Sequence, residues 1–275
     1  MKKLISVILV LVLALALAST ASAATTGVED GILTVAMECN YAPYNWTQSD
    51  DSNGAVPIRD TNEYANGYDV MMAKKLCEAN GWTLEIVRLD WDSLVPAVLS
   101  GTVDAVIAGQ SMTKERAEMV DFAGPYLYAS IVCLAKAGTP QASAASIDEL
   151  TGSCTSQLGT IWYDTCLPQV KNAVISFAAE SAPAMLMALE TGTVDFVCTD
   201  MPTAQGAVIA YPDMVILSFE GENGFDVSDE DINIGISVRK GNTFLLDALN
   251  SVLSPMTADD FNAMMAEATA IAPIE

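Results

Sequence analysis

The chain has 275 residues, with 35 acidic side chains, 12 basic side chains and no histidine, so its formal net charge is −23. A surface this acidic repels nucleic acid and anionic lipid, and neither is expected as a partner. The absence of histidine removes every Ser-His or Cys-His nucleophile pair and the commonest metal ligand, which disfavours ordinary hydrolase chemistry. The length allows one or two domains with a sizeable core.

The first 23 residues have the pattern of a cleaved secretory signal peptide. Lys2 and Lys3 precede an apolar run over 4–18, and Ala-Ser-Ala at 21–23 matches an A-x-A cleavage site. Cleavage there leaves 10 basic residues against 35 acidic ones, a balance of −25. No later apolar run reaches the ~18 residues that span a bilayer. We therefore expect an exported protein without direct membrane insertion.

A ten-residue pattern that occurs twice predicts the architecture. Residues 100–109 and 191–200 match at five of ten positions and lie 91 residues apart. Each copy follows a helical stretch, breaks it with a glycine (Gly101 or Gly192) and continues as an apolar run typical of a buried parallel strand. The separation is too long for a solenoid, so the repeat favours two similar α/β lobes, each with a doubly wound sheet.

The remaining segments agree with alternating strands and helices. In chain order, the sequence predicts a strand at 33–37, a helix at 70–79, a strand at 84–87, the helix of the first repeat at 94–99, a strand at 153–156, a helix at 161–167, the helix of the second repeat at 184–189, and closing helices at 244–253 and 259–268. The stretch 136–146 is rich in Ala, Ser, Gly and Pro, which predicts an exposed connection between the lobes.

The six cysteines leave their oxidation state open. No two of them form a C-x-x-C pair, so a zinc ribbon or a thioredoxin-type site has no support. Export permits disulfides, whereas a free thiol also packs well as a small apolar group in stretches such as those around Cys133 and Cys198.

The two repeats also point to a binding site. Ligands of such sheets bind at the carboxyl ends of the strands, so Gly109 and Asp200 should lie on opposite walls of one cleft. Thr113 is placed to cap a helix with Arg116 in its first turn, and a helix start beside a guanidinium binds carboxylates well. Asp200 offers the opposite charge, and the pair suits a zwitterion such as an α-amino acid. Taken singly, both charges would be ordinary solvated surface groups.

Several short motifs, in this order, resemble the polar amino-acid solute-binding proteins of ABC importers, extracellular solute-binding family three. The resemblance runs from residue 33 to about 250. The motifs that carry it are YAPYNW at 41–46, GYDV at 67–70, WDSLVPA at 91–97, the stretch 103–116, VDF at 120–122, QLGT at 157–160 and RKGN at 239–242. The resemblance implies a two-lobed periplasmic-binding-protein fold of type II, with mostly parallel sheets flanked by helices and a two-segment hinge.

The expected lobes follow from this resemblance and from the repeat. Lobe one should comprise 28–127 plus 233–275, and lobe two should comprise 128–232. The chain would then cross the hinge twice, near 126–130 and near 229–233. Closure of the lobes around a ligand would exclude water and strengthen the charged contacts.

Matching positions imply the ligand contacts of the first lobe. Tyr41 and Trp91 fall where aromatic rings sandwich the ligand, although an aromatic residue taken alone is more often part of a core. Gly109 should offer its backbone carbonyl to the ligand ammonium, with Ala108 beside it. Ser111 and Arg116 should hold the carboxylate, and in the second lobe Asp200 should take the ammonium.

Three further positions complete the implied site. Gln157 and Thr160 lie at the start of the first helix of the second lobe, where the family contacts its ligand. A hydroxyl residue commonly follows this position, but here it is Ile161, which weakens side-chain hydrogen bonding and leaves the backbone amides. Glu38 lies where relatives place a selectivity residue. Facing the cleft, it would favour basic or amide ligands, and the alternative is a surface carboxylate at a strand end.

The resulting hypothesis is an exported receptor that binds a free L-amino acid, polar or basic, and delivers it to the membrane subunits of an ABC permease. It would act as a monomer without cofactor, metal or chemistry, in the periplasm or at the cell surface, and no lipobox cysteine is seen. One rival is a dehydratase-like enzyme on the same scaffold, acting on a small carboxylic acid with Glu38 as acid or base. Another is a sensor or adhesin module with no transport role.

Overall fold

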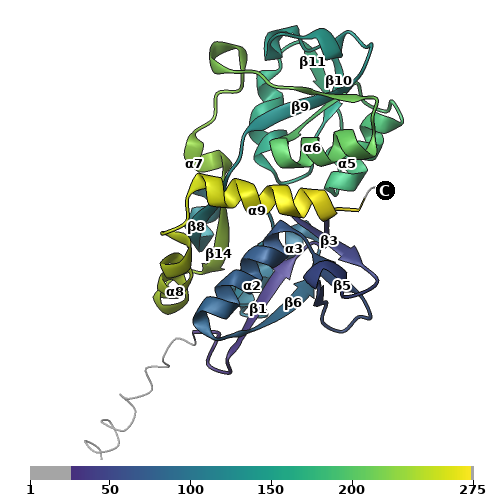
Figure 1. Cartoon of the computed structure of the whole chain (residues 1–275). Helices are drawn as coiled ribbons and strands as arrows, with labels where there is room; N and C mark the ends of the chain where they lie inside the picture. Colours follow the sequence, from purple (N-terminus) through teal and green to yellow (C-terminus); the bar gives the residue numbers. More distant parts are fainter. Residues whose placement is uncertain (1–25, 274–275) are drawn as a thin grey trace, which may run out of the picture.

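The computed structural model describes residues 26–273, which fold into two α/β lobes. Figure 1 shows the lobes one above the other, with helix α9 (Ala258–Ile271) lying across the region between them. The predicted signal peptide lies outside the described residues. Within those residues, no helix combines the length and the apolar character that crossing a membrane requires.

The first lobe is built on a five-stranded sheet in the order β6-β1-β7-β14-β8. The first three strands run parallel, whereas β14 is antiparallel to both of its neighbours. Side chains of the central strands, such as Leu33, Val35 and Ile236, are fully buried, as in sheets that helices cover. The elements are β1 (Ile32–Met37), α2 (Tyr68–Asn80), β6 (Thr83–Arg88), α3 (Trp91–Ser100), β7 (Ala105–Val106), α4 (Lys114–Met119), β8 (Val120–Tyr128), β14 (Asn233–Arg239) and α8 (Thr243–Leu253).

The second lobe repeats this arrangement in the order β11-β10-β12-β9-β13, with three parallel strands followed by two antiparallel pairings. The chain enters this sheet after Tyr128 and has left it before Asn233. The predicted two-lobed α/β fold is thereby confirmed. The elements are β9 (Ile131–Lys136), β10 (Gly152–Thr155), β11 (Ala173–Ile175), α5 (Ala182–Glu190), β12 (Phe196–Asp200), α6 (Met201–Ala210), β13 (Met214–Leu217) and α7 (Asp229–Ile232).

The sequence repeat corresponds to one structural unit in each lobe. In the first lobe α3 is followed by Gly101 (φ 75°) and then β7, and in the second lobe α5 is followed by Gly192 (φ 72°) and then β12. Both glycines adopt the left-handed backbone conformation that ends a helix and that other residues disfavour. β7 and β12 occupy the same place in their sheets, so their carboxyl ends reach equivalent positions.

Residues 40–66 form a small third sheet, which the sequence did not predict. Its strand order is β2-β3-β5-β4, and all pairings are antiparallel. The strands are β2 (Asn40–Tyr41), β3 (Asn45–Gln48), β4 (Val56–Pro57) and β5 (Tyr64–Asn66). Short 3₁₀ turns lie at Ser52–Gly54, Gln141–Ser143, Ile147–Glu149, Leu167–Gln169 and Gly221–Asn223.

Two predicted segments differ in the structure. The stretch 136–146 joins β9 to β10 inside the second lobe rather than connecting the lobes, because its loop composition does not specify which strands it joins. The segment 161–167 is a π-helical turn, Trp162–Cys166, that continues as a 3₁₀ turn rather than an α-helix. Pro168 has no N–H to continue an α-helical ladder there.

All six cysteines, which lie within the described residues, are buried free thiols. The thiols therefore pack as small apolar groups and form no disulfides within the described residues. Cys133 and Cys198 lie opposite one another on β9 and β12, inside one core cluster that also contains Cys154 and Cys166. Burial raises the pKa of Cys154 to about 12, which keeps this thiol protonated at neutral pH.

Candidate functional site

The ten predicted site residues lie where strands of the two large sheets end. Those that follow β1, β6 and β7 of the first sheet are Glu38, Tyr41, Trp91, Ala108, Gly109, Ser111 and Arg116. Those that follow or end β10 and β12 of the second sheet are Gln157, Thr160 and Asp200. Hydrogen bonds join four of the first-lobe residues to the second lobe, so the two groups face each other.

Asp200 is held between a helix of its own lobe and a tyrosine of the other. One carboxylate oxygen accepts the backbone N–H of Thr203 (2.8 Å) and caps α6, and the other accepts the hydroxyl of Tyr41 (2.8 Å). The side chain is fully buried, and burial raises its pKa. The capping role was not predicted, although an aspartate before Met201-Pro202 is typical of a helix start.

Arg116 lies on α4, the helix that follows β7 in the first lobe. Thr113 caps α4 by accepting the backbone N–H of Arg116 (3.3 Å), which confirms the predicted helix start. The guanidinium donates to the carbonyl of Ser111 (2.8 Å) and, across the lobes, to the carbonyl of Gly159 (2.9 Å). It also lies over the ring of Trp91, 5.3 Å from its centre. Burial lowers its pKa to about 10, so the group stays charged at neutral pH.

Glu38 is buried between the lobes rather than exposed at the surface. Its side chain follows β1, is 4% exposed and receives two long contacts, 3.4 and 3.5 Å, from the amide of Gln157 in the second lobe. Burial raises its pKa to about 7, and the carboxylates of Asp90, Asp69 and Asp92 act in the same direction. The structure thus places Glu38 facing the cleft.

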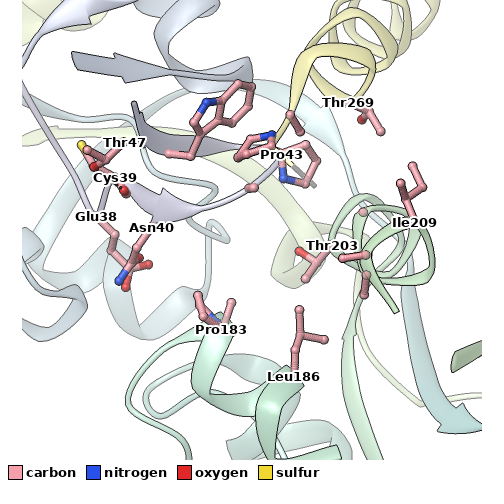
Figure 2. A pocket seen from close by; sticks show the side chains of 18 of the residues that line it. Glu38, Cys39, Asn40, Pro43, Thr47, Pro183, Leu186, Thr203, Ile209 and Thr269 are labelled. Atoms are coloured by element: carbon pink, nitrogen blue, oxygen red, sulfur yellow. Dashed lines mark hydrogen bonds between the residues drawn. The ribbon is translucent and has the colours of Figure 1, made fainter. Parts of the chain in front are cut away.

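Glu38 lines a cavity of about 950 Å³ between the lobes (Figure 2). Asn40 and Pro43 of the first lobe contribute to one side, and Leu186 of α5 and Thr203 of α6 contribute to the other. A second cavity of about 400 Å³ is lined by Trp91, Arg116, Thr160 and Ile161, among others. Within 26–273, no three carboxylate or thiol groups are placed to hold a metal ion.

The predicted charged pair does not share either hollow. Arg116 lines the smaller of these two cavities, whereas Asp200 lines neither of them, because the hydroxyl of Tyr41 covers its carboxylate. Both charges nevertheless contact the opposite lobe, Asp200 from the end of β12 and Arg116 from α4, the helix that follows the matched strand β7. A zwitterion that touched both would take the places of the Tyr41 hydroxyl on Asp200 and of the Gly159 carbonyl on Arg116.

The backbone between these charges is shaped by one glycine. Gly109 has φ 61°, and a Cβ atom there would come within 2.9 Å of the ring of Tyr41 and 3.1 Å of that of Tyr44. Only glycine fits this position without strain. Ala108 and Ser111 on either side are buried. The rings of Tyr41 and Tyr44 stack at 4.8 Å and form the floor below Gly109.

A buried polar network beneath the cleft was missed in the sequence. Asp69, fully buried near the start of α2, accepts the Tyr126 hydroxyl (2.6 Å) and the Asn45 amide (2.7 Å). The backbone N–H of Gly109 donates to the same Tyr126 hydroxyl (3.1 Å). Burial raises the pKa of Asp69 to about 7. The GYDV motif at 67–70 contains this aspartate, but nothing in its spacing indicated a link to Gly109.

Two mixed α/β lobes with polar groups facing across a cleft define the class of two-lobed solute-binding proteins. The chain belongs to the bacterial extracellular solute-binding proteins, family 3, whose profile matches residues 33–267. A probable histidine-binding protein of Neisseria gonorrhoeae is 28% identical over 238 residues, which cover 84% of this chain and 80% of the relative.

Two further matches extend this comparison. A putative ABC transporter arginine-binding protein 2 of Escherichia coli strain K12 is 26% identical over 243 residues, with 87% of this chain and 88% of the relative covered. A solved structure of an ancestral arginine-binding protein bound to arginine matches with a TM-score of 0.67 and 28% identity, covering 86% of this chain and 97% of that one. All three relatives are named as binding proteins.

Proposed function

We propose that this protein is the substrate-binding receptor of an ABC importer and captures a free L-amino acid between its lobes. The observation that carries the proposal is that Asp200, at the end of β12, and Arg116, on the helix that follows the matched strand β7, both form hydrogen bonds to the opposite lobe. The receptor is exported to the periplasm or the cell surface and hands its ligand to the permease. Its lobes, 28–127 plus 233–275 and 128–232, move about the two crossings.

Exchange of hydrogen-bond partners favours a zwitterionic ligand. Arg116 donates to a neutral carbonyl, Gly159, and a carboxylate in its place makes shorter and stronger charge-assisted bonds. Asp200 accepts from the neutral hydroxyl of Tyr41, and an ammonium is the stronger donor. Ser111, Gly109 and the amides near Thr160 add polar contacts. Binding therefore replaces two neutral partners with two charged ones inside a site from which water is excluded.

The cavity beside Glu38 favours an amino-acid ligand with a basic side chain. Glu38 lines the larger cavity together with Glu63 and Asp90, while Arg88 in the same wall is already paired with Glu63 at 2.7 Å. A cation placed beside Glu38 would lower the pKa of this carboxyl and ionise it, which stabilises both charges. The names of the histidine- and arginine-binding relatives agree with this preference.

A thermal-shift screen against the standard amino acids, with ornithine added, tests this function. A ligand at 100 times its Kd stabilises the native state by about 2.7 kcal/mol, and we expect the largest rise in melting temperature with arginine, lysine, ornithine or histidine. If no amino acid raises the melting temperature, the proposal fails.

Glu38 also motivates one alternative, a dehydratase-like enzyme acting on a small carboxylic acid. A buried carboxyl with a pKa of about 7 is suited to general acid–base catalysis at neutral pH. Mass spectrometry of amino acids and cyclic hydroxy acids after incubation with the protein separates the two. Recovery of unchanged ligand is expected for the receptor, and loss of water from a ligand would favour the enzyme.

A further inference from the structure

Three fully buried polar groups form a continuous chain beneath the cleft. The Tyr126 hydroxyl donates to Asp69 at 2.6 Å, and the backbone N–H of Gly109 donates to that same hydroxyl at 3.1 Å. The other carboxylate oxygen of Asp69 accepts the amide of Asn45 at 2.7 Å. This hydrogen-bonded network connects α2, β3 and β8 to Gly109.

We propose that Asp69 is a positioning residue, which acts through the Tyr126 hydroxyl to hold Gly109 in its ligand-binding conformation. The proposal deepens the amino-acid receptor function and rests on it for the role of Gly109. Asp69 itself touches no ligand and is enclosed by Asn45, Tyr126 and their neighbours.

The direction of each hydrogen bond follows from the chemistry of the groups. A tyrosine hydroxyl can donate one hydrogen bond, and Tyr126 donates it to Asp69. The oxygen of Tyr126 therefore remains an acceptor for the Gly109 N–H. Asp69 is itself fixed, because its second oxygen accepts the amide of Asn45 and because its backbone lies in the first turn of α2. The fold thus anchors the acceptor without help from a ligand.

The hydrogen bond from Gly109 to Tyr126 matters because a glycine backbone is otherwise weakly restrained. With φ 61° and no Cβ, Gly109 has little intrinsic conformational restraint. The stacked rings of Tyr41 and Tyr44 limit it from one side, and the bond to Tyr126 fixes its peptide plane from the other. A buried N–H left without an acceptor is unfavourable, so loss of the Tyr126 hydroxyl would shift this backbone.

Tyr68 offers a matched control. Its hydroxyl is also fully buried and donates to the backbone carbonyl of Tyr126, and the two rings stack at 5.6 Å. Tyr68→Phe therefore removes one buried hydroxyl of the same kind from the same cluster, while the bonds from Tyr126 to Asp69 and Gly109 remain. Any difference between Tyr126→Phe and Tyr68→Phe at the cleft reports positioning rather than general destabilisation.

The experiment measures arginine affinity by calorimetry and the hydrogen-exchange rate of the Gly109 amide without ligand, in the full mature chain. We expect Tyr126→Phe to weaken binding about tenfold and to speed exchange at Gly109, whereas Tyr68→Phe leaves both at the wild-type value. Asp69→Asn should weaken binding by a similar factor. The double variant Asp69→Asn with Tyr126→Phe should bind no more weakly than Tyr126→Phe alone, because Asp69 acts through that hydroxyl.

Unchanged exchange and affinity in Tyr126→Phe would overturn the proposal, as would equal losses in Tyr68→Phe or additive losses in the double variant. If the wild-type protein binds no amino acid, the receptor function fails. The exchange rate of Gly109 in the variants then still decides whether Asp69 and Tyr126 hold this residue, so the two failures are distinguishable.

Discussion

The two walls of the cleft are held in different ways. On the first wall, Gly109 rests on tyrosine rings and on a fully buried network that ends at Asp69. On the second wall, Asp200 is fixed by the cap that it forms on α6, and the Gln157 amide reaches Glu38 only at 3.4 Å. Gly109 is therefore held by its own lobe alone, whereas Asp200 and Gln157 of the second wall also form hydrogen bonds across the gap.

This difference indicates that the two walls have different roles in ligand binding. A preformed wall binds ligand without a large ordering penalty, and a wall whose polar groups turn outward gains its partners only when the lobes meet. The contacts Tyr41–Asp200 and Arg116–Gly159 show which groups meet across the gap. We expect the first wall to dock the ligand and the second wall to close on it.

The largest effect is expected for Arg116→Ala on the first wall. In the proposed complex the change removes two charge-assisted hydrogen bonds to the ligand carboxylate, about 4 kcal/mol, and arginine affinity measured by calorimetry should fall roughly 1,000-fold. Arg116→Lys keeps the charge but not the planar, bidentate donor geometry of the guanidinium, and it should lose less affinity. The fold should persist, because the cap on α4 uses the backbone of this residue. Affinity retained in Arg116→Ala would show that the carboxylate is held elsewhere.

The second-largest effect concerns Glu38, which joins the two walls. Its pKa is about 7 in the folded protein against 4.5 as an ordinary value, so the folded state holds its proton more tightly than the unfolded state does. The stability that this proton contributes is complete below pH 4.5 and is lost as the pH rises through 7, by about 3 kcal/mol. Glu38→Gln should lose this part of the pH dependence.

Urea unfolding of both proteins at pH 4.5 and 7.5, without ligand, measures the difference. Asp69 is retained in both proteins, and its pKa is also raised, so it contributes a pH dependence in the same direction. Only the difference in pH dependence between wild type and variant therefore reports on Glu38. Parallel pH profiles for the two proteins would mean that Glu38 is solvated, and the cleft would then lack its proposed acidic group.

Much of the fold could be predicted from the sequence, because the repeat at 100–109 and 191–200 combines a helix end, a glycine and an apolar strand. These local signals depend on the conformational preferences of the residues themselves, so tertiary packing does not alter what they predict. Segment 136–146 was misplaced because a loop composition says nothing about which strands it joins. The π-helical turn at Trp162–Cys166 was missed because helical periodicity does not distinguish it from an α-helix over so few residues.

For the site, the sequence predicted which residues lie on the facing walls but not how they are partnered. The cap of Asp200 on α6 was readable from Met201-Pro202. The cover that Tyr41 places over Asp200, and the link from Asp69 to Gly109, connect residues 159 and 40 positions apart and depend on the packed lobes. Such distant polar pairings leave no periodic signal in a single sequence.

The smallest effect tests how the first wall aims its guanidinium. Thr113→Ala removes the side-chain cap on α4 and should lower the free energy of unfolding by about 1 kcal/mol. Thr257→Ala is a control, because this threonine also accepts the backbone N–H three residues on at the start of α9, within a capping box with Asp260. Thr257→Ala should lose at least as much stability in urea unfolding, but only Thr113→Ala should also weaken arginine binding, because α4 carries Arg116. Equal affinities in the two variants would mean that packing on Trp91, and not the helix start, orients the guanidinium.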